Sequence, residues 1–229
     1  MTPTSATDRL PSASGRQVAR HRIRERLQEM ILSGNYRPGA RLVQQDLARR
    51  FDVGQGLVRE ALLELQSNGL VETVDRRGVF VKQIDARMLL ESFHVREMHE
   101  GLIARLCCGR LNDADHAELT KLAQAMPTLA EEGRLDEMAQ LDRKFHHRLL
   151  HLADNQILVR LADNYRLLGK VVRANRDPAV VCDEHMAVLD AVADDAPDKA
   201  ERLMRRHISA AREAVEQMIR KRELPDWVA

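Results

Sequence analysis

The apolar residues of the first third of the chain follow a helical spacing three times and then the spacing of short strands. The spacing predicts an opening helix over Val18–Ser33, a short second helix, a turn at Gly54 and a third helix. The third helix has the most regular apolar stripe, formed by Leu57, Val58, Ala61, Leu62 and Leu65. Residues 70–74 and 79–81 read as two strands. Helix, turn, helix and hairpin in this order predict a winged helix-turn-helix over residues 18–82.

After a linker at residues 83–85, the apolar spacing is helical throughout, and Asp85 is a plausible cap for the first of these helices. The predicted helices are Met88–Leu111, His116–Glu131, Leu135–Leu152, Gln156–Ala174, Cys182–Ala193 and Pro197–Arg222. Asp113 is expected to cap the second of them. The expected fold is therefore mainly α: an N-terminal winged helix-turn-helix followed by an all-α antiparallel helical bundle over residues 83–222. Residues 1–17 are expected to be a disordered tail and residues 223–229 a C-terminal tail.

Composition narrows the class of protein. With 44% apolar and 31% charged residues, the chain has the composition of a soluble globular protein. It has no apolar run long enough to cross a membrane and no apolar core of a signal peptide at its start. The three cysteines, Cys107, Cys108 and Cys182, form no disulfide pattern and are expected in core positions. These features predict a cytoplasmic protein with no membrane partner.

Charge is distributed unevenly along the chain. Residues 1–83 carry 14 Lys and Arg against 9 Asp and Glu, whereas the remainder carries 22 against 26. The basic surplus therefore belongs to the predicted winged domain, as neutralisation of DNA phosphates requires. The acidic remainder is poorly suited to contacting DNA.

The predicted winged domain offers candidate DNA-binding residues. Arg59 lies on the polar side of the third helix, whose N-terminal part can enter the major groove. Arg76 and Arg77 occupy the tip of the wing, and Gly78 allows the backbone there a close approach to DNA. The alternative is an ordinary helical hairpin with solvated arginines. The candidates are Gln44, Gln55, Gly56, Arg59, Arg76, Arg77 and Gly78.

The helical half contains a possible metal site. Asp142 and His146 are four residues apart and face the same side of a helix. His185 and His207 also border apolar stripes, and imidazole and carboxylate groups are normal ligands of Zn²⁺, Ni²⁺ and similar ions. Histidines beside apolar stripes are more often structural, and His147 with His151 forms a competing pair. The residues alone leave both interpretations open.

The winged segment resembles the DNA-binding domain of the GntR family of bacterial transcription regulators. The matching residues are Ile31, Gly34, Pro38-Gly39, Leu42, Leu47-Ala48, Val53, Val58-Arg59-Glu60-Ala61-Leu62, Leu65, Gly69-Leu70-Val71 and Arg77-Gly78. The family usually has Ser-Arg-Thr-Pro where this chain has Gly54-Gln55-Gly56-Leu57. Gln55 therefore replaces an arginine that reads a base. Because Gln favours adenine where Arg favours guanine, the operator sequence is not transferable from relatives.

Residues 85–222 are similar to the FCD ligand-binding domain of the FadR branch of that family. The resemblance maps the family's Asp-x3-His, Glu-His and third His onto Asp142 with His146, Glu184-His185 and His207. It implies a divalent metal, Zn or Ni first, joined by a small carboxylate effector. Arg96 is the first candidate to bind the effector, with a structural pair to Glu100 as the alternative. Asn164, Tyr165 and Arg166 are further candidates for lining the same site.

The resemblance implies a homodimeric transcription regulator, most often a repressor in this family, that binds double-stranded operator DNA. Two half-sites are expected because one recognition helix reads only a few base pairs. Three other functions are alternatives. A metal-dependent enzyme fused to a DNA-binding module would use Glu184 as its general base. A regulator that senses the metal itself would be expected to present thiolate or exposed ligands. A regulator that senses an acyl thioester would have no need of the filled metal motif.

Overall fold

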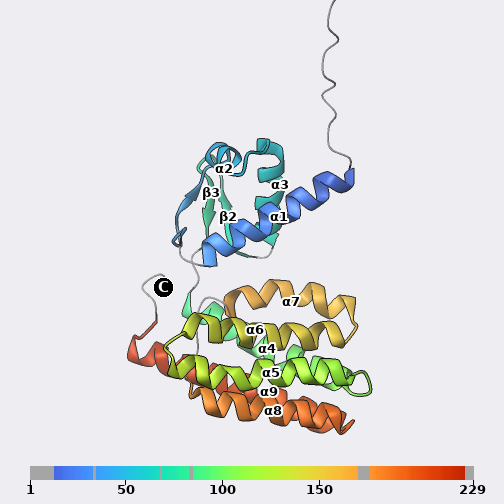
Figure 1. Cartoon of the computed structure of the whole chain (residues 1–229). Helices are drawn as coiled ribbons and strands as arrows, with labels where there is room; N and C mark the ends of the chain where they lie inside the picture. The colour runs from blue at the N-terminus through green and yellow to red at the C-terminus, as the bar shows by residue number, and fades with distance from the viewer. Residues whose placement is uncertain (1–12, 33–34, 68, 83–84, 170–175, 225–229) are drawn as a thin grey trace, which may run out of the picture. The chain divides into compact units, whose positions relative to one another are not determined.

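The computed structural model describes residues 13–32, 35–67, 69–82, 85–169 and 176–224 (Figure 1). The chain divides into two compact units, Met1–Gln83 and Ile84–Ala229. Each unit has its own apolar core. No helix within the described ranges is long and apolar enough to cross a membrane.

The first unit is a winged helix-turn-helix. Its elements are α1 (Ala13–Leu32), β1 (Arg41–Leu42), α2 (Gln44–Phe51), α3 (Gln55–Ser67), β2 (Val71–Val74) and β3 (Gly78–Val81). The strands form an antiparallel sheet in the order β1-β3-β2, with Arg41 opposite Phe80 and Val74 opposite Gly78. This sheet forms the wing. The predicted winged helix-turn-helix fold is therefore present.

Apolar packing and one left-handed residue determine the geometry of this unit. The side chains of Val58, Ala61, Leu62 and Leu65 on α3 are buried, and α1 packs against α3. Asp52 ends α2 with a φ of 52°, and its N–H donates back to the last turn of that helix. This conformation turns the chain sharply and lets α3 begin three residues later. The short connection between α2 and α3 is the turn of the motif.

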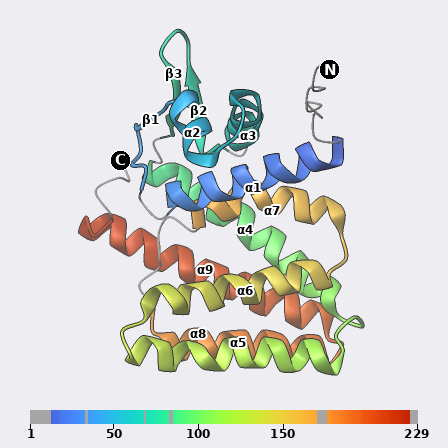
Figure 2. The same cartoon turned by 45° about the horizontal axis from the view of Figure 1, so that its top comes forward.

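The second unit is an all-α bundle (Figures 1 and 2). Its helices within the described residues are α4 (Ala86–Cys107), α5 (Asp113–Glu131), α6 (Leu135–Leu152), α7 (Gln156–Gly169), α8 (Pro178–Ala193) and α9 (Pro197–Lys221). Helix α4 packs against α6, α7, α8 and α9, while α5 packs against α6 and α8. Phe93 on α4 and Phe145 on α6 are among the largest fully buried side chains. The bundle core therefore lies between α4 and the helices that carry the predicted metal ligands.

Several predicted helix ends are wrong. Helix α1 begins at Ala13, inside the segment predicted to be a disordered tail, and residues 1–12 lie outside the described ranges. Helix α4 ends at Cys107 and not Leu111, because the chain turns through Gly109 at a φ of 72°. Asn112 and not Asp113 caps α5, because the Asn112 side chain accepts a hydrogen bond from the N–H of Asp115.

The remaining predicted boundaries have mixed outcomes. The cap of α4 is Asp85, as predicted, since its carboxylate accepts from the N–H of Met88 at 2.6 Å. Helix α8 starts at Pro178, four residues before the predicted start, with Asp177 as its cap. Residues 170–174, predicted to extend the fourth bundle helix, lie outside the described ranges, as do linker residues 83 and 84.

Several apolar residues of the predicted helices are exposed, and not all of the cysteines occupy the core positions expected of them. Val18 on α1, together with Met98 and Leu102 on α4, lies at the surface, and the Met98 residue is 68% exposed. Of the cysteines, only Cys107 is buried, and Cys108 and Cys182 are half-buried. Burial raises the pKa of the Cys107 thiol to about 12.

Candidate metal centre and DNA-contact surface

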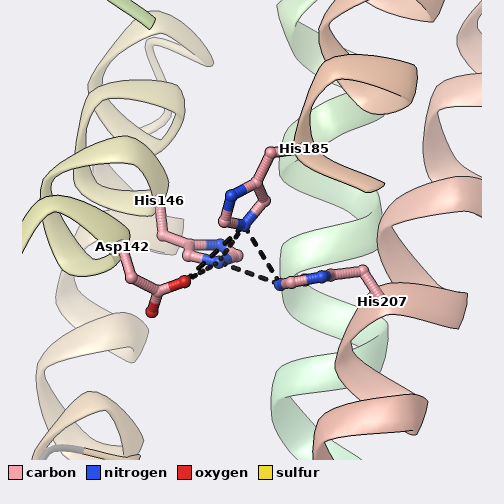
Figure 3. Close-up of side chains that lie close together, drawn as sticks. All are labelled: Asp142, His146, His185 and His207. Carbon is pink, nitrogen blue, oxygen red and sulfur yellow. Dashed lines mark hydrogen bonds and ion pairs between the residues drawn. The ribbon is translucent and has the colours of Figure 1, made fainter. Parts of the chain in front are cut away.

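Three helices bring the four predicted metal ligands together (Figure 3). Helix α6 carries Asp142 and His146 one turn apart, α8 carries His185, and α9 carries His207. The Nε2 atoms of the three histidines are 3.2 to 3.3 Å from one another. The Asp142 Oδ1 atom lies 3.8 Å from His146 Nε2 and 3.7 Å from His185 Nε2. One donor atom from each residue therefore faces a common point.

The spacing of these atoms fits a bound divalent ion. Zinc–nitrogen bonds are about 2.0 to 2.1 Å long, so two imidazole nitrogens on a tetrahedral ion lie about 3.3 Å apart. The observed separations of the three Nε2 atoms agree with that value. The three histidines are buried, whereas the Asp142 side chain is 36% exposed. The cluster is thus closed by imidazoles and reaches solvent on the side of Asp142.

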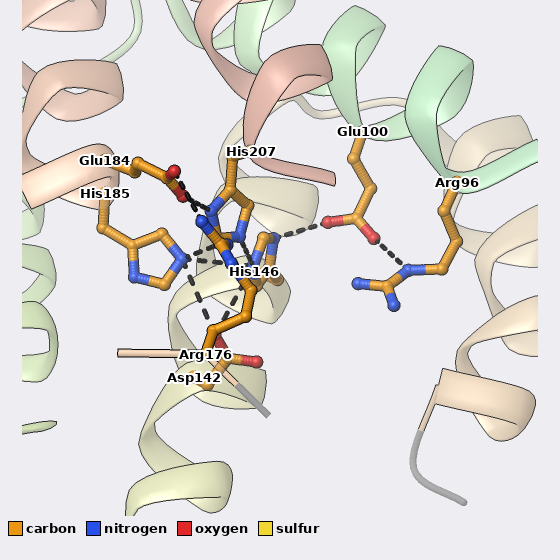
Figure 4. A network of polar contacts seen from close by, with 8 residues as sticks. All are labelled: Arg96, Glu100, Asp142, His146, Arg176, Glu184, His185 and His207. Atoms are coloured by element: carbon orange, nitrogen blue, oxygen red, sulfur yellow. Dashed lines mark hydrogen bonds and ion pairs between the residues drawn. The ribbon is translucent and has the colours of Figure 1, made fainter. Parts of the chain in front are cut away.

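Two carboxylates, the buried Glu100 and the half-buried Glu184, bear on which nitrogen of two histidines carries the proton (Figure 4). Glu100 Oε2 on α4 lies 2.5 Å from His146 Nδ1, and Glu184 Oε2 on α8 lies 2.7 Å from His207 Nδ1. A neighbouring carboxylate favours a proton on Nδ1 of each imidazole, and in that tautomer the Nε2 lone pairs of His146 and His207 face each other. Such carboxylate–imidazole pairs orient metal-binding histidines. A cation between the Nε2 atoms removes the repulsion between their lone pairs.

Burial also keeps the histidines ready to bind a metal. It lowers the pKa of His185 well below its ordinary value, and it lowers the pKa of His207 despite the hydrogen bond to Glu184. Both imidazoles are therefore neutral at neutral pH, as metal coordination requires. Burial opposes the ionisation of Glu184, but hydrogen bonds from His207 and Arg176 outweigh it and hold the pKa of Glu184 below its usual range.

Each of these two glutamates is held by an arginine. Arg96 Nε donates to Glu100 Oε1 at 2.9 Å, and Arg176 Nη2 donates to Glu184 Oε1 at 2.6 Å. The pairing of Arg96 with Glu100 is the structural alternative to a role in effector binding. Arg176 was missed by the sequence analysis. It precedes α8 in a segment without apolar periodicity, so its proximity to the histidines depends entirely on the fold.

The other predicted effector contacts are not described in the structure. Asn164, Tyr165 and Arg166 belong to α7, but their side chains lie outside the described part of the chain. The competing histidine pair is present on the exposed face of α6, where His147 Nε2 lies 3.1 Å from His151 Nε2. That pair gathers no third ligand among the described residues, whereas the buried cluster gathers four.

The predicted recognition helix presents its N-terminal part to solvent. Gln55, Gly56 and Arg59 on α3 are exposed, while Val58 between them is buried. Gln44 is the first residue of α2 and is half-buried. A Cβ atom added at Gly56 would meet nothing within 4 Å. The surface at the start of α3 is therefore polar and uncrowded, as contact with base edges requires.

The wing presents arginines from the turn between β2 and β3 and from β1. Arg76 adopts a φ of 58° at the hairpin tip, and the Arg77 guanidinium lies 5.6 Å from the centre of the Phe80 ring. A Cβ atom at Gly78, where φ is 106°, would approach Arg41 Nε to 3.4 Å. Arg41 on β1 is thus a further basic residue beside the wing. The sequence does not predict this place for Arg41, because the two-residue strand that carries it has no recognisable pattern.

Comparison with known proteins identifies both units. Residues 19–81 match the bacterial regulatory proteins of the gntR family, and residues 91–210 match the FCD domain. The chain is 26% identical over 195 residues to the HTH-type transcriptional repressor RspR of Escherichia coli K12, covering 83% of this chain and 85% of that protein. It is 30% identical over 206 residues to an HTH-type transcriptional regulator of Streptomyces ambofaciens, covering 84% of this chain and 83% of that protein. The chain belongs to the GntR family.

The solved structures of GntR regulators support the same fold. E. coli McbR/YncC matches with a TM-score of 0.74 at 20% identity, over 88% of this chain and 98% of that one. The predicted fold class is confirmed, and so is the resemblance to GntR regulators with an FCD domain. The matched families and relatives are transcription regulators, so this GntR protein is a regulator and not an enzyme.

Proposed function

We propose that this GntR regulator is a repressor whose affinity for operator DNA is controlled by a small carboxylate effector bound at a metal in the helical unit. The observation that carries this proposal is the convergence of Asp142, His146, His185 and His207 on one point. Burying three imidazoles against one another without a cation between them is unfavourable, because two of the facing nitrogens present lone pairs. The arrangement is accounted for when a divalent ion occupies it.

The four ligands would hold the ion, and their neighbours would keep them oriented. Three imidazoles and one carboxylate suit Zn²⁺ or Ni²⁺ among the common divalent ions. When bound, the ion supplies a Lewis-acidic centre to which a carboxylate oxygen can attach. Glu100 and Glu184 maintain the tautomers of His146 and His207. The exposed side of Asp142 provides the approach for a small ligand.

DNA binding is assigned to the start of α3 and to the wing. Gln55, Gly56 and Arg59 are proposed to face base edges in the major groove, with Gln44 on α2 near the backbone. Arg76 and Arg77, with Gly78 behind them, are proposed to contact phosphates or the minor groove. The exposure of the α3 and wing-tip residues supports these roles.

A homodimer is proposed from the surface of α4. Val95, Met98 and Leu102 are exposed and share one face of the helix, with Glu91 seven residues before Met98 and Arg105 seven residues after it. If two copies pack their α4 helices antiparallel about a two-fold axis at Met98, Glu91 of each copy lies beside Arg105 of the other. The stripe is thus apolar in its centre and complementary in charge at its ends.

The dimer proposal has a direct test. Met98→Glu would place a charge at the centre of the stripe, and sedimentation equilibrium is expected to show monomers where the wild type shows dimers. Leu63→Glu alters an exposed apolar residue of α3 and serves as the control. A Met98→Glu protein that remains dimeric would rule out this surface as the interface.

Control of DNA binding requires coupling between the two units. If the carboxylate weakens binding to the operator, then operator DNA must weaken binding of the carboxylate by the same factor. Helices α6, α8 and α9 each supply ligands, so occupation of the site constrains three helices at once. We propose that this constraint changes the arrangement of the operator-binding domains in the dimer.

The proposal is tested by metal content and DNA release measured on the same preparations. Elemental mass spectrometry of the wild type is expected to find about one ion per chain, as a four-ligand site requires. The double variant His185→Ala/His207→Ala should contain none. Fluorescence anisotropy with operator DNA should show release by hydroxy- and dicarboxylic acids for the wild type only. Release that is unchanged in the double variant would refute the role of the metal.

A further inference from the structure

Arg176 has a donor that the described structure does not use. Its side chain is 11% exposed, and its Nη2 atom donates to Glu184. Its Nη1 atom is fully buried and has no hydrogen-bond partner among the described residues. A buried guanidinium donor without an acceptor is unfavourable, because it has lost its hydrogen bonds to water and forms none within the protein. Arg176 therefore lacks one acceptor oxygen.

This donor lies at the histidine cluster. Arg176 reaches the cluster through Glu184, whose other oxygen accepts from His207. Figure 4 shows the Arg176 side chain extending across the histidines toward Glu184, with Asp142 near its base. The charge of Arg176 also contributes to the low pKa of His185, after burial and the neighbouring imidazoles. A ligand that enters from the side of Asp142 would meet both the metal ligands and Arg176.

The charges of the surrounding network favour an anion at this place. Besides the three histidines, the network contains the carboxylates of Glu100, Asp142 and Glu184 and the guanidiniums of Arg96 and Arg176 (Figure 4). These five groups leave one negative charge, and a divalent ion would change the total to one positive charge. An uncompensated charge is unfavourable in a buried site. One carboxylate would neutralise it, whereas the metal-free network would repel a carboxylate.

From this geometry we infer that Arg176 binds the effector, donating from Nη1 to one carboxylate oxygen while the other oxygen faces the metal. The inference rests on the proposed function and adds the residue that selects a carboxylate. A carboxylate offers two coplanar oxygens, which match a metal on one side and a guanidinium donor on the other. Arg96, the candidate from the sequence, holds Glu100 on the opposite side of His146 and serves to orient that histidine.

Cobalt-loaded full-length protein allows a test that separates binding of the metal from binding of the carboxylate. The visible absorption of Co²⁺ in the wild type is titrated with acetate, lactate and malonate, and the metal content of every variant is measured in parallel. Arg176→Gln keeps a donor for Glu184 but loses the second one. We expect Arg176→Gln to retain cobalt and to raise the carboxylate dissociation constant about 10- to 100-fold, the usual cost of losing a hydrogen bond to a charged group.

Two further variants serve as controls. Arg87→Gln removes an exposed arginine of α4 that pairs with Glu91, and its carboxylate affinity at full cobalt loading should stay within about threefold of wild type, because no hydrogen bond to the ligand is lost. Arg176→Lys keeps the charge without the planar fork and should fall between wild type and Arg176→Gln. Metal-free wild type should bind none of the three acids by calorimetry.

The outcomes distinguish the inference from the proposed function. If wild-type cobalt protein responds to the acids and Arg176→Gln responds with equal affinity, the inference fails while the proposed function stands. If cobalt-loaded wild type responds to none of them, the carboxylate effector itself is refuted. A stronger response to inorganic phosphate than to any acid would overturn the selection of a carboxylate by Arg176.

Discussion

The two units of this GntR regulator place their candidate functional residues in opposite environments. In the winged unit, Gln55, Arg59 and Arg77 lie at the surface, where solvent satisfies their hydrogen-bonding groups. In the helical unit, His146, His185 and His207 are buried within the bundle core. A surface site can be changed at little cost to folding, whereas a buried polar cluster affects both stability and function. Substitutions in the winged unit should therefore change mainly DNA binding, whereas changes at the histidine cluster should also change stability.

The largest expected effect concerns removal of the proposed metal. A ligand present at a thousand times its dissociation constant stabilises the native state by about 4 kcal/mol. Chelation should therefore accelerate amide hydrogen exchange in α6, α8 and α9, which carry the ligands, and leave α1, α2 and α3 nearly unchanged. Mass spectrometry of peptides from each unit measures the difference. His207→Ala should abolish the response to chelator, whereas His147→Ala, on the exposed face of α6, should retain it. An equal increase in the exchange rate of both units would contradict a metal site confined to the helical unit.

The second effect belongs to the recognition helix. Arg59→Ala should weaken operator binding by about 1 to 3 kcal/mol and relax specificity at one base pair, if Arg59 contacts a base edge. Anisotropy titrations with operator and unrelated duplexes separate the loss of affinity from the loss of specificity. Arg87→Ala in α4 removes an exposed arginine that pairs with Glu91 and is the matched control. Equal weakening on both duplexes would show that Arg59 contacts only the backbone.

Local sequence was sufficient for most of the winged unit. The stripe of α3 was predicted correctly because Val58, Ala61, Leu62 and Leu65 follow helical spacing without interruption. The start of α1 was missed because Ala13 to Gln17 contains no large apolar residue. The end of α4 was predicted too late because apolar residues continue to Leu111, although the chain leaves the helix at Cys108. Spacing reports which residues could be buried and not where the backbone turns.

The candidate metal site was only partly predictable. Asp142 and His146 are neighbours on one helix, so their proximity follows from spacing alone. His185 is 39 residues from His146 in sequence, and only the packing of α6, α8 and α9 brings their Nε2 atoms to 3.3 Å. The family resemblance supplied that information in the sequence analysis. Arg176 had no such support, because neither periodicity nor the motif includes it.

The third effect concerns the wing. Arg77→Ala should weaken binding about equally on operator and unrelated DNA, because a phosphate contact carries no sequence information. Each lost phosphate contact should also reduce the slope of log affinity against log salt concentration by about one. Titrations at several salt concentrations measure that slope, with Arg26→Ala on α1 as the exposed control. Loss of affinity restricted to the operator would instead mean that Arg77 reads bases.

The smallest effect tests whether the start of α3 is adapted to DNA at the expense of stability. Gly56 is the second residue of α3, and a Cβ atom there would meet nothing within 4 Å. Gly56→Ala should therefore raise the free energy of unfolding of the winged unit by about 0.5 to 1 kcal/mol. Gly69 is equally uncrowded but has a φ of 74°, so Gly69→Ala should destabilise the same unit. Urea denaturation measures both changes. If Gly56→Ala is more stable and also binds the operator more weakly, the glycine serves close approach to DNA; unchanged operator affinity would rule out that role.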